Sequence, residues 1–368
     1  MENTESRLYF ACDYMEGAHP SIMKKLLETN LEKTVGYGLD PYTAEAKEKI
    51  RKACEASDAE VFLLVGGTQT NATVIGALLK SYQGVVAAET GHIATHEAGA
   101  IELGGHKVLP IPQKDGKISA AQIEKLVKDF YEDVNCEHEV MPGMVYISQP
   151  TEYGTLYSKE ELTALSKVCR ESHLPLYVDG ARLAYALASK ENDVTLADLA
   201  ALCDVFYIGG TKCGALFGEA VVIPQKDLLP HFFTVVKQHG ALLAKGRLAG
   251  IQFGVFFTDG LYESIGKPAI QAAAQIKAAL LQSGYRLYLD TPTNQVFCIV
   301  SNEVMERIAK NVEFGFWEKY DETHSVIRFA TSWATTEEDT QKLIRLLREN
   351  SPAAESGGYS KSAFDTCS

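Results

Sequence analysis

Short apolar runs alternate with helical patterns between residues 41 and 223, and this alternation limits the folds that are open to the chain. Strands that are apolar throughout are typical of a sheet covered on both faces, and intervening helices are typical of parallel strands. We therefore predict an α/β domain on a mainly parallel sheet. The expected strands are 61–65, 85–88, 107–111, 144–148, 176–178, 205–208 and 220–223, and the expected helices are 41–55, 71–79, 96–103, 119–130, 159–172 and 196–202.

The length of 368 residues favours one large domain with a smaller companion. A glycine-punctuated apolar segment, 240–261, is expected to close the large domain. Beyond it, the patterns at 269–281, 295–300 and 336–347 predict a smaller C-terminal α/β domain. We place an N-terminal arm at 1–40, the large domain at 41–258 and the small domain at 259–350. The tail 351–368 is rich in Ser, Gly and Ala and is expected to be disordered.

Charge and cysteine content narrow the classes of partner and the location. The chain carries 35 basic and 48 acidic residues, a net charge of −13, which disfavours nucleic acid and anionic membranes as partners. No apolar run approaches the roughly 18–20 residues that span a bilayer, and no apolar signal core follows the N-terminus. The eight cysteines are scattered without a close pair, as in reduced proteins. We expect a cytoplasmic protein without membrane or nucleic-acid partners.

Polar residues follow four of the predicted strands, at the edge where sheets of this kind bind ligands. The first group is Gly66-Gly67-Thr68-Gln69-Thr70-Asn71, between a strand and a helix. Its glycines allow close approach of the backbone, and the helix N-terminus offers free N–H groups to an anion. A tight turn with a threonine cap explains the same residues equally well.

The other three groups carry acid, base and imidazole side chains. Asp179 and Arg182 follow the strand at 176–178, where they bind a ligand or simply pair with each other. Lys212 lies in a glycine-flanked turn after the strand at 205–208, which is unusual because most lysines lie on solvated helix faces. His92 and His96 have the spacing of two metal ligands on a helix, but no third ligand accompanies them, so we predict no metal.

Together these groups predict pyridoxal phosphate as the cofactor. This cofactor requires a phosphate cradle, an aspartate, a flat ring such as that of His92, and a lysine. The lysine forms an imine with its aldehyde, and the aspartate keeps the pyridine nitrogen protonated so that the ring accepts electrons. Lys212 lies 33 residues after Asp179, a separation that fits one helix, 196–202, and the next strand.

The same residues resemble the L-threonine aldolases, pyridoxal-phosphate enzymes of the β-eliminating lyase group with fold type I, the aspartate aminotransferase-like fold. The resemblance runs from about residue 10 to residue 335. Its strongest element is Val178-Asp179-Gly180-Ala181-Arg182-Leu183. Weaker matches are the phosphate loop at 67–71, the Tyr-Gly-x-Asp segment at 37–41, and the histidine segment of Gly91-His92 with Glu97-Ala98-Gly99. Their order and spacing together are specific.

The resemblance implies a set of cofactor contacts. Lys212 would carry the Schiff base, Asp179 would bind the pyridine nitrogen and His92 would stack on the ring. The phosphate would be held by Gly67, Thr68 and Gln69. In the family, a segment of the neighbouring subunit reaches the cofactor phosphate, and residues 237–247 correspond to that segment. Lys245 stands where the family usually has arginine. The resemblance therefore implies a homodimer or homotetramer with shared sites.

It also implies a set of substrate contacts. Arg182 would contact the phenolic oxygen of the cofactor or the carboxylate of an amino-acid substrate, and Arg328 would bind that carboxylate. Asp13 and Tyr37, in the N-terminal segments that match the family, would also bind the substrate. Two departures stand out: Cys12-Asp13-Tyr14 replaces the usual Ser-Asp-Thr, and Glu152 replaces the histidine of Thr-His-x-Gly. In the family that histidine touches the substrate hydroxyl.

We therefore predict a carbon–carbon lyase that splits a β-hydroxy-α-amino acid, L-threonine or L-allo-threonine, into glycine and an aldehyde. The base for the β-hydroxyl proton is either Glu152 or His92 acting through water. β-Elimination and transamination on the same scaffold are the alternatives. The alternative outside the enzymes is a binding protein of the same fold without catalytic activity. The presence of Asp179 and Lys212 argues against it.

Overall fold

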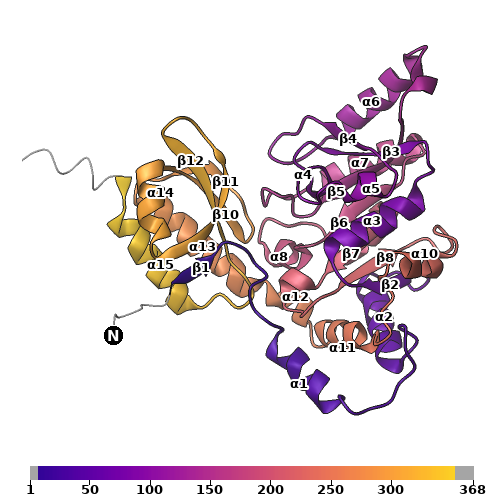
Figure 1. Cartoon of the computed structure of the whole chain (residues 1–368), viewed down its shortest axis with the longest axis horizontal. Coiled ribbons are helices and arrows are strands. Elements are labelled where there is room, and N and C mark those ends of the chain that lie inside the picture. The colour runs from indigo at the N-terminus through magenta and orange to yellow at the C-terminus, as the bar shows by residue number, and fades with distance from the viewer. Residues whose placement is uncertain (1–6, 353–368) are drawn as a thin grey trace, which may run out of the picture. The chain divides into compact units, whose positions relative to one another are not determined.

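The computed structural model describes residues 7–352, which form two compact units (Figure 1). The larger unit comprises residues 14–267, and the smaller one includes residues 7–13 and 268–352. These units divide at other positions than the predicted domain boundaries at 40 and 258. The reason is that residues of the predicted arm join the sheet of the smaller unit, while the helix Leu261–Ile265, beyond residue 258, packs within the larger one. The predicted disordered tail lies, from residue 353 on, outside the described residues.

A seven-stranded sheet forms the centre of the larger unit, in the order β2-β8-β7-β6-β5-β3-β4. Only β8 runs antiparallel to its neighbours, and all other pairs are parallel, so the predicted mainly parallel sheet is confirmed. The strands are β2 (Glu60–Leu64), β3 (Gln83–Ala88), β4 (Val108–Ile111), β5 (Met141–Ser148), β6 (Leu176–Asp179), β7 (Val205–Gly209) and β8 (Glu219–Ile223).

The helices of this unit begin where the sequence offers caps. Asp40 accepts the N–H of Thr43 at 2.9 Å ahead of α2, and Ser119 and Ser158 form capping boxes for α6 and α7. The helices are α1 (Pro20–Glu28), α2 (Pro41–Ala53), α3 (Gly67–Leu78), α4 (His92–Thr95), α5 (Ala100–Leu103), α6 (Ala120–Glu132), α7 (Lys159–Glu171), α8 (Leu183–Ala188), α9 (Leu196–Leu202), α10 (Phe232–Gln238), α11 (Arg247–Phe256) and α12 (Leu261–Ile265), with the 3₁₀ turns η1 (Cys136–His138) and η2 (Thr211–Cys213).

One predicted helix, 96–103, is wrong. The chain forms the two short helices α4 and α5 instead, because Ala98 and Gly99 lie between them with φ values of 51° and 74°. This left-handed conformation interrupts a right-handed helix. Glu97, immediately before the break, is buried in the larger unit with only 5% of its surface exposed.

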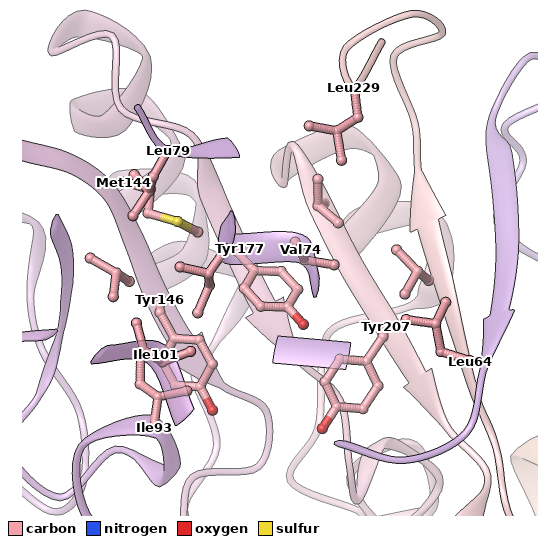
Figure 2. Packing of buried hydrophobic residues seen from close by; sticks show 14 of the residues in the cluster. Leu64, Val74, Leu79, Ile93, Ile101, Met144, Tyr146, Tyr177, Tyr207 and Leu229 are labelled. Atoms are coloured by element: carbon pink, nitrogen blue, oxygen red, sulfur yellow. The ribbon is translucent and has the colours of Figure 1, made fainter. Parts of the chain in front are cut away.

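Three tyrosines on neighbouring strands run through the core of the larger unit. Figure 2 shows Tyr146, Tyr177 and Tyr207 among aliphatic side chains such as Val74 and Ile101. None of the three is more than 1% exposed. A buried hydroxyl needs a hydrogen-bond partner, and each of these finds one near the carboxyl end of β6. The tyrosines of the core therefore donate hydrogen bonds to Asp179 and Asn71, at the edge of the sheet where ligands are expected.

The smaller unit contains a five-stranded sheet in the order β1-β11-β12-β10-β9, in which only β1 and β11 pair in parallel. Its core includes Phe10, Ile327 and Phe329. The elements are β1 (Leu8–Phe10), β9 (Arg286–Leu289), β10 (Gln295–Ser301), β11 (Val312–Lys319), β12 (His324–Ala330), α13 (Lys267–Gln282), α14 (Asn302–Ala309) and α15 (Glu337–Glu349). Within residues 7–352, no helix has the length and apolar character needed to cross a membrane.

Candidate active site

A pocket of about 270 Å³ lies in the larger unit at the carboxyl ends of the parallel strands. Sheets of this kind bind ligands at this edge. The pocket is lined by residues from β5, β6, β7 and the loops that follow β2 and β3. It brings together seven of the residues that the sequence predicts for the site: Gly67, Thr68, His92, Glu152, Asp179, Arg182 and Lys212.

Asp179, the last residue of β6, is 3% exposed and accepts hydrogen bonds at both carboxylate oxygens. Oδ2 accepts from Asn71 Nδ2 at 3.0 Å and from the Tyr146 hydroxyl at 2.7 Å, and Oδ1 accepts from the Tyr207 hydroxyl. Burial by itself would raise the pKa of this carboxyl, but the electrostatic interaction with His92 and these hydrogen bonds outweigh it, so the pKa of Asp179 is lowered. The site thus holds a buried, ionised carboxylate.

The N-terminus of α3 presents Gly67 and Thr68 to the pocket. The first N–H groups of a helix have no partner within the helix, so they suit an anion such as phosphate. A side chain at Gly67 would put its Cβ 3.2 Å from the Tyr207 hydroxyl, so glycine keeps this approach open. Gln69 does not line the pocket: its amide donates to the His239 carbonyl at 3.0 Å.

Lys212 lies in the turn η2, directly after β7. The Tyr185 hydroxyl donates to the Lys212 carbonyl at 2.6 Å, and the Lys212 ammonium lies 5.8 Å from the centre of the Tyr14 ring. Gly214 ends the turn in the left-handed region, with φ of 99°. The lysine is thus held by its backbone while its side chain faces the pocket that contains Asp179.

His92 is oriented by a buried carboxylate. Its Nδ1 lies 2.8 Å from Oε1 of Glu97, and the same oxygen accepts from Asn71 Nδ2 at 2.7 Å. Asn71 in turn donates to Asp179, so His92 and Asp179 are linked through two side chains. A carboxylate on one ring nitrogen fixes the orientation of an imidazole. Glu97 therefore acts as a positioning residue for His92.

Glu152 lies beside the amide of His92. Its Oε1 accepts the N–H of His92 at 2.9 Å and the hydroxyl of Ser148 at 2.6 Å. Burial raises the pKa of Glu152, aided by the charge of Asp179, and this effect exceeds the opposing influence of the hydrogen bonds and of His92. A raised pKa makes a carboxylate a stronger base at neutral pH. The structure thus places Glu152, the clearest departure from the family pattern, in the pocket.

Two predicted residues of the larger unit are exposed on its surface and do not line the pocket. Tyr37 is 43% exposed, and its ring lies 4.4 Å from the ammonium of Lys237. Lys245 is exposed as well. Arg247, from the same segment, donates to the carbonyl oxygens of Glu32 and Thr29 in its own chain.

Asp13 and Arg328 belong to the smaller unit. Asp13 is fully buried and accepts from Asn294 Nδ2 at 2.9 Å. Arg328 donates to Gln295 Oε1 at 3.0 Å and to the Ala11 carbonyl at 2.8 Å. Their assignment to the substrate stays a prediction, as do the roles of Tyr37 and Lys245.

Several polar residues of the site were not predicted from the sequence. In the sequence Tyr146, Tyr177 and Tyr207 look like ordinary members of apolar strands. Each lies two residues before the end of its strand, however, and this shared pattern is a signal for a polar centre. Glu219 also lines the pocket. As the first residue of an antiparallel strand it lies at the carboxyl edge of its parallel neighbours, a position that becomes visible only once the direction of β8 is known.

Comparison with known proteins identifies relatives over nearly the whole chain. Residues 10–303 match the model of the beta-eliminating lyase family. A low specificity L-threonine aldolase from Pseudomonas aeruginosa is 32% identical over 350 residues, which cover 94% of this chain and 98% of that protein.

Solved structures agree with this relationship. A threonine aldolase from Leishmania major superposes with a TM-score of 0.90 at 41% identity, covering 93% of this chain and 99% of that one. An aspartate aminotransferase from Thermus thermophilus superposes with a TM-score of 0.70 at 15% identity, covering 94% and 91%. The second likeness concerns the fold alone, and it confirms the predicted fold type I.

Proposed function

The chain belongs to the β-eliminating lyase family, and we propose that it is a pyridoxal-phosphate-dependent carbon–carbon lyase that cleaves L-threonine or L-allo-threonine to glycine and an aldehyde. The observation that carries this function is the match to threonine aldolases over nearly the full length of the chain. The family resemblance inferred from the sequence is thereby confirmed. The pocket adds the chemistry, since Lys212 and the ionised Asp179 face the same space as His92.

The residues present fit pyridoxal phosphate. The buried Asp179 carboxylate suits a protonated ring nitrogen, because its lowered pKa keeps it ionised. The α3 N-terminus with Gly67 and Thr68 suits the phosphate, and His92 offers a flat ring. Lys212 supplies the amine. When bound, the cofactor supplies an aldehyde that condenses with amines and a ring that accepts electrons from a breaking bond.

The chain's own residues then perform three tasks. Asp179 keeps a negative charge at the base of the pocket, held by Asn71 and two tyrosine hydroxyls. Arg182 lines the pocket and offers a cation to the substrate carboxylate or to a cofactor oxygen. Glu152 takes the proton of the substrate hydroxyl, since its raised pKa brings it toward the working pH of a general base.

Product analysis tests this function against its alternatives. We expect the purified, cofactor-loaded chain to convert L-threonine and L-allo-threonine into equal amounts of glycine and acetaldehyde. β-Elimination would instead release ammonia and 2-oxobutanoate, and transamination would leave a keto acid that retains the hydroxyl. L-Serine is the matched control, because cleavage gives formaldehyde whereas elimination gives pyruvate. Keto-acid products from these substrates would overturn the lyase assignment.

We also propose that the active protein is at least a dimer. Four apolar residues at every fourth position of the N-terminal segment are largely exposed: Leu27 at 79%, Leu31 at 91%, Val35 at 64% and Leu39 at 68%. Exposed apolar residues concentrated in one segment are typical of an interaction surface. A second copy of this chain is the partner that the family resemblance implies, with the segment 237–247 also contributing.

Sedimentation velocity of the purified chain tests the assembly. We expect a species of at least twice the mass of one chain, and we expect Leu31→Lys to shift the population toward monomer, because a buried lysine without a partner is costly. Leu103→Lys, at the end of α5 and likewise 91% exposed, is the control. A wild-type monomer with full activity would contradict the proposal.

Buried thiols support a reducing, cytoplasmic location, which we infer as the site of action. Within residues 7–352, Cys54, Cys169, Cys203 and Cys298 are buried and are not joined in disulfides. Burial raises the pKa of Cys54 to about 12 and of Cys169 to about 12, so these thiols are inert.

A further inference from the structure

Glu219 is a buried acid in the pocket that neither the sequence nor the family resemblance assigns. It begins β8, and because β8 runs antiparallel, Glu219 lies opposite Gly209 at the end of β7 and opposite Leu64 at the end of β2. Only 3% of its surface is exposed, yet it lines the same pocket as Lys212. A buried acid in a ligand pocket is a candidate for a functional role.

The carboxylate of Glu219 holds the turn that carries Lys212. Oε2 accepts the N–H of Gly210 at 3.0 Å, and Oε1 accepts the hydroxyl of Thr211 at 2.7 Å. The Thr211 oxygen in turn accepts the N–H of Gly218 at 3.1 Å. Gly210 and Thr211 are the two residues immediately before Lys212. Glu219 therefore bonds to this turn twice, once through a backbone N–H and once through a side-chain hydroxyl.

We propose that Glu219 is a positioning residue for Lys212: it fixes the turn η2, and its negative charge favours retention of the proton on the lysine nitrogen. This inference rests on the proposed function, because it requires Lys212 to carry the cofactor. No covalent step is assigned to Glu219.

The surroundings of Glu219 determine the pH range in which its carboxyl group is ionised. Burial raises the pKa of Glu219 to about 8, while the Thr211 and Gly210 hydrogen bonds and the charge of Lys212 oppose the shift and Asp179 adds to it. The hydroxyls of Tyr207, Tyr177 and Tyr262 also feel its charge, but burial raises their pKa values so that they stay neutral. Glu219 is therefore neutral well below pH 8 and becomes an anion above it. Because attraction between two charges is mutual, the anion then holds a proton on Lys212.

The visible absorbance of the bound cofactor reports this protonation without any substrate. In the cofactor-loaded chain we expect Glu219→Gln to share the wild-type spectrum at low pH. On titration toward alkali, the midpoint of its spectral transition should lie lower than that of the wild type by about one pH unit, the scale of an opposite charge close by. Glutamine keeps the size and an acceptor oxygen, so a merely structural role of Glu219 would leave the midpoint unchanged. An unchanged midpoint overturns the inference.

Two further variants sharpen the test. Glu60→Gln removes the same charge at the opposite end of the β2–β8 pair, where Glu60 faces Ile223, and should leave the midpoint in place. Thr211→Val removes one hydrogen bond that lowers the pKa of Glu219, so it should move the midpoint in the same direction by a smaller amount. If Glu219→Gln fails to fold by circular dichroism, an unshifted Thr211→Val overturns the inference instead. A wild-type chain without visible absorbance would contradict the proposed function rather than the role of Glu219.

Discussion

Lys212→Ala is expected to reduce the release of glycine from L-threonine to background, a loss of roughly 10³-fold or more, as for other enzymes deprived of a covalent amine or nucleophile. Lys212 is the lysine that lines the pocket beside Asp179. Its backbone carbonyl, not its side chain, accepts the bond from Tyr185, so the substitution leaves the turn intact. Activity and far-ultraviolet circular dichroism are measured together.

The matched control is Lys226→Ala, which removes an exposed lysine after β8 and should retain wild-type turnover. Non-covalent binding of the cofactor to Lys212→Ala is compatible with the account, since Asp179 and the α3 N-terminus remain. A folded Lys212→Ala protein that keeps a tenth of the wild-type activity would remove Lys212 from the reaction.

Glu152→Gln is the second large effect: we expect kcat to fall by roughly two to four orders of magnitude, the usual contribution of a general base. The glutamine amide oxygen can still accept from the His92 N–H and from Ser148, so the pocket keeps its shape while the base is lost. Cofactor absorbance should be retained. Near-normal turnover would return Glu152 to a structural role and leave His92 as the base.

The pH profile separates these two bases further. Burial raises the pKa of Glu152, so the carboxylate forms at higher pH than that of an exposed glutamate. If Glu152 is the base, wild-type kcat falls as the pH drops through this raised pKa, and Glu152→Gln lacks that fall. If His92 is the base, Glu97→Gln should instead lower kcat, because Glu97 orients the His92 ring. Glu171→Gln, exposed at the end of α7, is the control for both variants.

Local patterns were sufficient to predict the large sheet. The central parallel strands β3, β5, β6 and β7 are buried on both faces and therefore largely apolar. The caps at Asp40, Ser119 and Thr195 start helices where the sequence indicates them. The strand-end groups around Asp179 and Lys212 followed from the same reasoning, because the carboxyl ends of parallel strands meet at one edge.

The remaining features depend on contacts between distant segments. The sequence groups Glu97 with His92, but it does not indicate that Glu97 also reaches Asn71, which lies 26 residues earlier in the chain. Glu219 enters the pocket only because β8 is reversed relative to its neighbours. In the smaller unit, β1 pairs with β11, which lies about 300 residues later in the chain. The local sequence at 8–10 cannot predict this pairing.

Borohydride reduction followed by peptide mapping shows whether Lys212 binds the cofactor covalently. Borohydride delivers hydride to a C=N bond between the cofactor and a lysine and converts it into a stable C–N bond, so the attached residue can be found by mass spectrometry. We expect the purified chain to be yellow, to lose this colour on reduction, and to carry one pyridoxyl group on the peptide that contains Lys212. A pyridoxyl group on another lysine, such as Lys245, or a chain that binds no pyridoxal phosphate, would contradict this expectation.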